Sequence, residues 1–422
     1  MASGVPDPQQ ARQTLARFYG AHPAAPGERQ YLDRHIGRYL KTLAALPRQP
    51  GALLDAGAFP GHLSLLAARM GWSVTGLGKM DGTFVGRDFE QRMRENGIEA
   101  LHADLERDPF PFPDDQFDAV FFNETAEHLA YNPYHALDQI WRTLKPNGTL
   151  VFSVPNLASF DHRWALLKGR TIYPLLTEPL GATFHADIAQ RHIREYTLSE
   201  CRYLLTGQDK YLYSFAIRKE IMDRSWDGLF HTEHGYRRQA KNVRIGTVLR
   251  DVLTRIFPRC RSNILIQAVK PPTYVRMSEA DLTVEGFYPE EMSGTGDSFV
   301  RRPLEACWMK TNARIAIRLP ASGRRVARIE LLLWLPAPAS LPPLPVRATV
   351  GSAPAAELAI APSPEPRRYS IPVPPEQRAC SETLLLDMET PGWIPAQHGL
   401  AADTRTLGMM THLKHIALVY ES

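Results

Sequence analysis

Cysteine is scarce in this sequence, and long apolar runs are missing from it. The four cysteines, Cys201, Cys260, Cys307 and Cys380, lie far apart and form no C-x-x-C pair. This spacing argues against a disulfide framework and favours a reducing compartment. No apolar run approaches the roughly 20 residues that span a bilayer, and the first ten residues lack the basic and apolar regions of a signal peptide. We therefore expect a cytoplasmic protein.

Strong charge and metal-ligand motifs are absent as well. The formal net charge is +4 over 422 residues, which does not by itself indicate a nucleic-acid partner. No group of His, Asp and Glu has the sequence spacing of metal ligands, so we expect no metal site. A hydrophobic content of 44% and a charged content of 22% are those of a globular protein. The length indicates two domains.

The first 45 residues read as a helical segment. Apolar residues recur at helical spacing over 10–46, with a breaker at 21–27 that contains two prolines and a glycine. This segment could pack on a sheet edge, the interpretation that we favour, or form one wall of a ligand cleft.

Strand and helix patterns alternate from Gly51 to about Asn156. Strands are expected at 52–54, 73–77, 99–103, 117–122 and 149–154, with helices at 60–70, 88–96 and 134–144 between them. Alternation of this kind predicts a parallel sheet with helices on its faces. Two further strands, at 212–221 and 262–269, are expected to close it.

The first strand-to-helix turn is the candidate ligand site. Leu53-Leu54-Asp55-Ala56-Gly57-Ala58-Phe59-Pro60-Gly61 reads as a buried strand, an acid, a glycine turn and a helix start. Gly57 and Gly61 permit close approach of the backbone to a ligand, and Pro60 suits the first turn of a helix. In doubly wound sheets a nucleotide-like ligand binds at this turn.

Several motifs in a fixed order resemble those of a known family. They are the acidic glycine turn, Asp104-Leu105, Phe117-Asp118-Ala119-Val120, Glu124-Thr125-Ala126-Glu127-His128-Leu129, and Leu144-Lys145-Pro146-Asn147-Gly148-Thr149-Leu150. Together they resemble class I S-adenosylmethionine-dependent methyltransferases of the subgroup that includes quinone-biosynthesis enzymes. The resemblance implies a doubly wound, mostly parallel, seven-stranded Rossmann-like sheet over residues 46–272.

The same resemblance implies a set of cofactor-binding residues. Asp55 would lie beneath the methionine amino group, Asp104 would accept from the adenine amino group, and Asn123 with Glu124 would border the methionine end. The full set is Asp55, Gly57, Ala58, Phe59, Gly61, Gly78, Asp104, Leu105, Asn123 and Glu124. Turn capping is the alternative role for Asp55 and Asp104, because Asp favours such positions.

Two positions depart from the family pattern. Gly78 stands where an acid usually binds the ribose hydroxyls, and Asp81 could replace that acid only if its loop folds back. Phe59 replaces the central glycine of the turn. The missing acid and the glycine spacing also argue against a nicotinamide dinucleotide.

Histidines after the fifth strand are the candidate bases. Methyl transfer to a hydroxyl benefits from a general base, and histidine titrates in the useful range. We select His185 and His192, with Glu195 to orient one of them; for His128 we favour a structural hydrogen bond. Thr197 and Glu200 have the spacing of a capping box before the next helix.

The segment Arg237–Arg261 is basic and carries an apolar stripe. Such a helix could contact an anionic membrane surface or a partner protein. A packing helix or lid with a solvated basic face is the interpretation that we favour.

Beyond Lys270-Pro271-Pro272-Thr273 the pattern changes. Short apolar runs separated by proline-rich turns predict an all-β sandwich over 273–422. This half resembles jelly-roll-like accessory domains of bacterial surface-glycan assembly.

Three hypotheses for the function follow. The first is S-adenosylmethionine-dependent O-methylation of a saccharide or glycan-linked acceptor. The second is a methyltransferase acting on a quinone or secondary metabolite. The third is a degenerate methyltransferase fold that serves as a binding or scaffold module.

Overall fold

The computed structural model contains two compact units. One comprises Met1–Thr206 and Phe215–Lys270, and the other Gly207–Ser214 and Pro271–Ser422. The division after Lys270 lies beside the boundary expected at 272/273. The structure describes residues 4–18, 28–79, 89–130, 133–172, 192–207, 212–223, 245–277, 279–288, 306–320, 324–378, 382–398 and 403–421.

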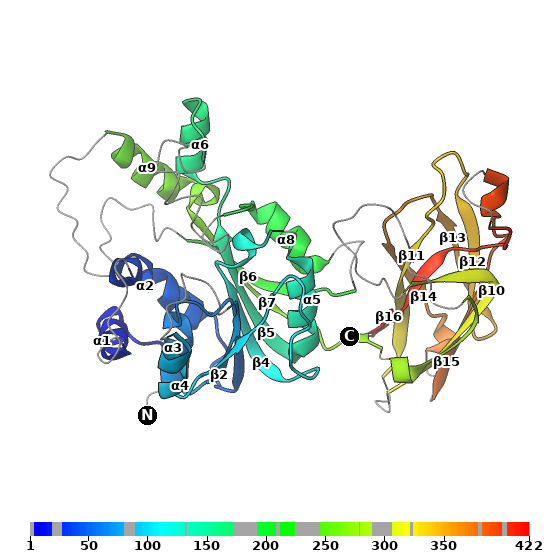
Figure 1. Cartoon of the computed structure of the whole chain (residues 1–422), viewed down its shortest axis with the longest axis horizontal. Coiled ribbons are helices and arrows are strands. Elements are labelled where there is room, and N and C mark those ends of the chain that lie inside the picture. Colours follow the sequence, from blue (N-terminus) through cyan, green and yellow to red (C-terminus); the bar gives the residue numbers. More distant parts are fainter. Residues whose placement is uncertain are drawn as a thin grey trace. The chain divides into compact units, whose positions relative to one another are not determined.

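The first unit is built on a Rossmann-like, parallel-rich sheet (Figure 1). Its described strands are β1 (Ala52–Ala56), β2 (Ser73–Gly78), β3 (Glu99–His102), β4 (Phe117–Asn123), β5 (Leu144–Pro155), β6 (Ala216–Asp223) and β7 (Asn263–Val269). They run in the order β3-β2-β1-β4-β5-β7-β6, and β7 pairs antiparallel with both β5 and β6. The predicted alternation is confirmed, and the two further strands close the sheet as expected.

The first unit also contains helices. They are α1 (Pro8–Phe18), α2 (Glu28–Ala44), α3 (His62–Arg69), α4 (Phe89–Glu95), α5 (Tyr134–Thr143), α6 (Phe160–Leu167), α8 (Leu198–Thr206) and α9 (Ile245–Ile256), with 3₁₀ turns η1 (Ala126–His128) and η5 (Pro258–Cys260). Strands β1 and β4 are almost continuously buried, as central parallel strands are when both faces are covered. None of the helices in the described part of the chain is long and apolar enough to cross a membrane.

The start of α3 differs from the prediction. The helix begins at His62, with Gly61 as its N-cap at φ 86°, so Pro60 precedes the helix instead of lying in its first turn. Because Gly61 has a left-handed backbone conformation, it cannot be part of the helix, and helical geometry begins at the next residue.

The second unit is an antiparallel sheet region. Its described strands are β8 (Tyr274–Arg276), β9 (Leu282–Phe287), β10 (Ala306–Arg318), β11 (Val326–Trp334), β12 (Leu344–Val350), β13 (Ala353–Ile360), β14 (Arg367–Pro372), β15 (Thr383–Glu389) and β16 (Met410–Tyr420). The main order is β13-β12-β15-β10-β16-β11-β14, with β8 on β16 and β9 on β10. Buried and exposed residues alternate along β12 and β15, which gives one face to an apolar core. A two-layer sandwich stays a prediction.

Candidate functional site

A small cavity lies where β1 and β4 end and α3 begins. Its volume is about 50 Å³, and it is lined by the strand ends, the glycine turn and one side of α2. The lining residues are Arg38, Tyr39, Thr42, Asp55, Gly57, Ala58, Phe59, Pro60, Gly61, His62, Leu63, Asn123 and Glu124. Small-molecule sites usually measure roughly 300–1,000 Å³, so a ligand of cofactor size requires side chains here to move.

Gly57 is required by its surroundings. Its φ is +93°, and a Cβ at this position would lie 2.1 Å from Thr125 Oγ1. Its amide donates to the Leu77 carbonyl oxygen at 2.7 Å, which joins the turn to the end of β2. Only glycine fits at position 57, and the turn therefore lies close to the ends of two strands.

Asp55 is a buried acid in the cavity wall. Burial raises its pKa from 3.8 to about 6, and the Ser64 hydroxyl, which donates to Oδ2 at 2.5 Å, partly offsets this effect. A cation in the cavity would stabilise the ionised form.

Asn123 carries the clearest sign of a missing ligand. Both polar atoms of its side chain are buried and have no hydrogen-bond partner among the described residues. Buried polar groups are nearly always hydrogen-bonded, and an exception at a cavity indicates a group that binds there.

Glu124 closes the cavity from the same strand end. It has φ +48°, and backbone strain of this kind clusters at functional sites. Its carboxylate accepts from Arg38 Nη1 at 2.7 Å, Ser153 Oγ at 2.9 Å and Asn263 Nδ2 at 3.1 Å.

Helix α2 supplies residues that the sequence reasoning missed. Arg38, Tyr39 and Thr42 line the cavity while neighbouring apolar residues of α2 pack into the core. Helix α2 therefore both packs into the core and forms part of the cavity wall, so both interpretations of the N-terminal segment apply. The sequence signal for these three residues was their spacing. Positions 38 and 42 lie four residues apart, and position 39 lies next to 38, so a helix brings them to one side.

His62 was also missed. It is fully buried, and its Nδ1 lies 3.2 Å from the Tyr39 hydroxyl. Burial, followed by the charge of Arg92, lowers its pKa to about 3, so the imidazole is neutral. It can donate or accept a hydrogen bond in the cavity without contributing charge.

The ten predicted cofactor residues divide into two groups. Seven line the cavity: Asp55, Gly57, Ala58, Phe59, Gly61, Asn123 and Glu124. The other three, Gly78, Asp104 and Leu105, lie outside the cavity lining. The Phe59 ring packs on Phe89 of α4, with 5.5 Å between centroids.

The Asp104 carboxylate is engaged in its own turn. Its Oδ1 accepts from the Glu106 amide at 2.9 Å, and Lys79 Nζ lies 3.2 Å from Oδ2. Burial opposes ionisation, but these two contacts outweigh it and lower the pKa of Asp104. An adenine amino group at this position would share the carboxylate with Lys79.

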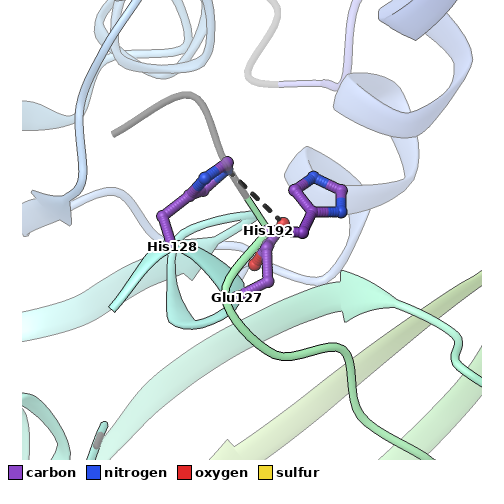
Figure 2. A group of neighbouring side chains, drawn as sticks. All are labelled: Glu127, His128 and His192. Atoms are coloured by element: carbon purple, nitrogen blue, oxygen red, sulfur yellow. Dashed lines mark ion pairs between the residues drawn. The ribbon is translucent and has the colours of Figure 1, made fainter. Parts of the chain in front are cut away.

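A cluster of Glu127, His128 and His192 lies beyond the cavity (Figure 2). One ligand atom from each residue lies within 4.8 Å of the others, so the cluster could hold a metal ion, although the sequence spacing indicated none. The signal was hidden because His192 is distant in sequence; its neighbour Ile193 donates an amide hydrogen bond to the Glu127 carbonyl oxygen at 2.6 Å.

Glu127 is a buried carboxyl group whose oxygens have no hydrogen-bond partner among the described residues. Burial, followed by the Glu124 carboxylate, raises its pKa well above the ordinary value. His128 Nε2 lies 3.9 Å from Glu127 Oε1.

Glu195 contacts two histidines. Its Oε1 lies 2.9 Å from His192 Nδ1, and its Oε2 lies 3.2 Å from His162 Nδ1. The predicted capping box fixes the segment that follows: the Thr197 amide donates to Glu200 Oε2 at 2.8 Å, and the Glu200 amide donates back to Thr197 Oγ1 at 3.3 Å. His185 lies outside the described residues, as does Asp81.

Comparison with known proteins identifies the kind of domain. Residues 29–207 match the family model for a methyltransferase domain. This match covers less than half of the chain, and the Rossmann-like sheet of the first unit agrees with it. No curated protein matches the chain.

Similar solved structures are remote. A chain of the complex between the Haloferax volcanii Trm112 methyltransferase activator and a methyltransferase is 20% identical, covering 64% of this chain and 100% of that one, with a TM-score of 0.38. Geranyl diphosphate C-methyltransferase from Streptomyces coelicolor A3(2) is 14% identical, covering 59% and 85%, with a TM-score of 0.37. At these values we draw nothing from them about this chain.

Residues 29–207 of the first unit are thus supported as a methyltransferase domain. S-adenosylmethionine is the cofactor that the sequence resemblance implies for it. The residues present fit that cofactor. Asp55 is a buried acid that could pair with an ammonium group, and Gly57, which has no Cβ, lets the turn come close to a ligand. The Asn123 amide at the adjacent strand end has no partner among the described residues.

Proposed function

We propose that this chain transfers a methyl group from S-adenosylmethionine to a hydroxyl of a saccharide or glycan-linked acceptor. The cofactor supplies an electrophilic methyl group, so the protein's own residues have to position the acceptor and accept its proton. Asp55, the Gly57–Gly61 turn and Asn123 would hold the cofactor. The unpartnered, buried Asn123 side chain is the observation that carries this assignment.

His192 is the proposed proton acceptor. His192 Nδ1 lies 2.9 Å from the Glu195 carboxylate, and a tautomer with the proton on Nδ1 would leave Nε2 to accept a proton from a hydroxyl. His192 is exposed, and the hydrogen bond from Ile193 to Glu127 ties this segment to η1, a few residues after Asn123. Because Glu127 follows Asn123 closely in the chain, this hydrogen bond supports a base near the cavity.

The saccharide part of the proposal rests on the second unit, which we take to be a two-layer sandwich. A groove of about 470 Å³ lies on its sheet, lined by Glu285, Gly286, Asn312, Ala313, Arg314, Arg347, Thr349, Asp387, Met388 and Glu389. Its carboxylates, guanidinium groups and amide suit a ligand rich in hydroxyl groups. The resemblance of this half to accessory domains of glycan assembly points the same way.

Calorimetry with S-adenosylmethionine is the first test. We expect a dissociation constant below about 1 mM and loss of binding in Asp55→Ala. Absence of binding by the unaltered chain would refute both enzymatic hypotheses and leave the scaffold hypothesis, which the small cavity and the Arg38–Glu124 ion pair favour.

Methyl transfer is then followed with labelled cofactor. A hydroxyl-bearing oligosaccharide and a hydroquinone-type phenol serve as alternative acceptors; labelling of the phenol alone would favour the small-molecule hypothesis. His192→Ala should lower kcat by roughly 10²–10⁴-fold if the histidine is the base. His398→Ala, an exposed histidine of the second unit, is the matched control.

Glu195→Gln tests whether Glu195 positions His192. It should lower kcat less than His192→Ala does and leave the affinity for S-adenosylmethionine unchanged, because Glu195 lies outside the cavity lining. A fall in cofactor affinity would show that the substitution disturbs the fold instead of the orientation of His192.

A further inference from the structure

Helices α6 and α9 form a pair in the first unit. Figure 1 shows them next to each other, and Arg250 Nη1 of α9 lies 3.0 Å from Asp161 Oδ2 of α6. Neither helix contributes a residue to the cavity or to the Glu127 cluster. His162 Nδ1 of α6 lies 3.2 Å from Glu195 Oε2, but the exposed apolar side chains of the pair have no part in the proposed chemistry.

This helix pair concentrates exposed apolar side chains. Nine large apolar side chains in the described part of the chain are exposed, and five of them belong to this pair and the residue that follows α9: Leu166, Leu167, Val252, Ile256 and Phe257. Leu167 is 77% exposed and Ile256 is 62% exposed. Val252 and Ile256 are four residues apart and so share one face of α9. Single exposed apolar residues are ordinary, but a group on two packed helices indicates a contact surface.

The charge around these residues is positive. The acids Asp161 and Asp251 are each paired with an arginine at 3.0 Å. Five basic residues of the pair and its flanks have no ion pair with any described residue: Arg163, Lys168, Arg170, Arg259 and Arg261. Over the described residues 245–261 the sequence carries four arginines against one acid.

Lys168 and Trp164 add a feature of interfacial helices. The Lys168 ammonium lies 4.5 Å from the centre of the Trp164 ring, with the apolar Leu166 and Leu167 between them in sequence. Long basic side chains can keep their charge at headgroup level while their stems and neighbouring apolar groups enter the acyl boundary.

We propose that the α6–α9 pair docks the protein on an anionic membrane surface. Exposed leucine, isoleucine and phenylalanine beside unpaired arginine and lysine match a bilayer whose surface is negative and whose interior is apolar. A protein partner is the alternative occupant, and the comparison of anionic with neutral vesicles distinguishes the two. The proposal is independent of methyl transfer.

Vesicle flotation of the full chain tests it. We expect binding to vesicles of equal parts phosphatidylcholine and phosphatidylglycerol, and much weaker binding to phosphatidylcholine alone. Ile256→Ser with Phe257→Ser should weaken binding to the anionic vesicles by about tenfold or more. Arg259→Gln should weaken it about fivefold, since each basic residue near the surface contributes on this scale.

Matched variants in the second unit serve as controls. Leu385→Ser removes an apolar side chain that is exposed on β15, and Arg318→Gln removes an exposed arginine of β10. Both should bind vesicles as the unaltered chain does. Leu167→Ser, on the other helix, repeats the apolar test if the α9 variant fails to fold, as judged by its circular dichroism.

Two outcomes would overturn the proposal. In one, the unaltered chain binds anionic vesicles no better than neutral ones. In the other, the variants on α6 and α9 bind as tightly as the controls, which would place the contact elsewhere on the molecule.

Discussion

At the scale of single residues, Asp55 shows how a group proposed to bind a ligand can oppose folding. Its carboxyl group is buried beside the cavity, and its pKa of about 6 lies above the ordinary value of 3.8. The folded state therefore binds the proton more tightly than the unfolded state does. The stability that this residue contributes is fully present below pH 3.8 and is lost as the pH rises through 6.

Asp55→Asn should separate stability from function. At pH 7 the amide avoids the cost of a buried charge, so we expect the free energy of unfolding to rise by about 1–3 kcal/mol. Binding of S-adenosylmethionine should be lost because the amide cannot pair with an ammonium group. Urea denaturation and calorimetry measure the two effects.

Asp118→Asn provides the contrast for that variant. The Asp118 pKa is lowered: partial burial opposes this shift, but hydrogen bonds from Lys145 and from the Ala52 amide outweigh it. This variant should be less stable than the unaltered chain and still bind the cofactor. Equal stability changes in both variants would contradict the role given to burial at Asp55.

Cofactor affinity should depend on pH through the same group. An ammonium ligand needs the ionised carboxylate, so affinity should fall about tenfold for each pH unit below roughly 6 and level off towards pH 7. Calorimetry between about pH 5 and 7 measures this slope. A flat profile in the unaltered chain would show that another group binds the ammonium.

At the scale of elements, the glycine turn joins three strands. The Gly57 amide bonds to the end of β2, and its Cα faces Thr125 beyond β4. A side chain at this point would push the strand ends apart, so the turn determines how close a ligand can lie to the sheet.

Gly57→Ala should destabilise the chain by about 2 kcal/mol or more and weaken cofactor binding, since it combines a left-handed φ with a 2.1 Å clash against Thr125 Oγ1. Gly97→Ala is the matched control: its φ is +74°, but nothing lies within 4 Å of the added Cβ. It should cost only the conformational part, about 1 kcal/mol. Thermal unfolding of both variants separates the cost of the clash with Thr125 from the cost of the left-handed backbone conformation.

The sequence predicted the sheet well because periodic apolar runs and buried parallel strands leave a local signature. Strand β4, expected at 117–122, is found at Phe117–Asn123, and β7, expected at 262–269, at Asn263–Val269. The capping box at Thr197 and Glu200 was recognisable for the same reason, since both partners lie three residues apart.

Contacts between distant segments left no comparable signature. Arg38 is 86 residues from Glu124, yet the two side chains meet at the cavity. His192 joins Glu127 only through tertiary folding. Asp104 was predicted from a motif, but its pairing with Lys79 depends on how neighbouring strand ends align.

At the scale of the whole molecule, the two units differ in the hollows that they carry. The first has a cavity of about 50 Å³ with a buried acid, and the second an open groove of about 470 Å³ lined by paired charges. If the groove binds a saccharide acceptor, changes in it should alter acceptor use and leave the cofactor unaffected.

Asp387→Ala combined with Glu389→Ala tests this division of roles in the full chain. Both carboxylates line the groove, so we expect KM for a saccharide acceptor to rise by about tenfold, the loss of one or two hydrogen bonds to a charged group, with the affinity for S-adenosylmethionine unchanged. Glu365→Ala with Glu376→Ala, in the same unit but outside the groove lining, is the control pair. Equal KM values for the groove pair and the control pair would place the acceptor on the first unit alone, and the quinone or secondary-metabolite hypothesis would then be favoured over the saccharide.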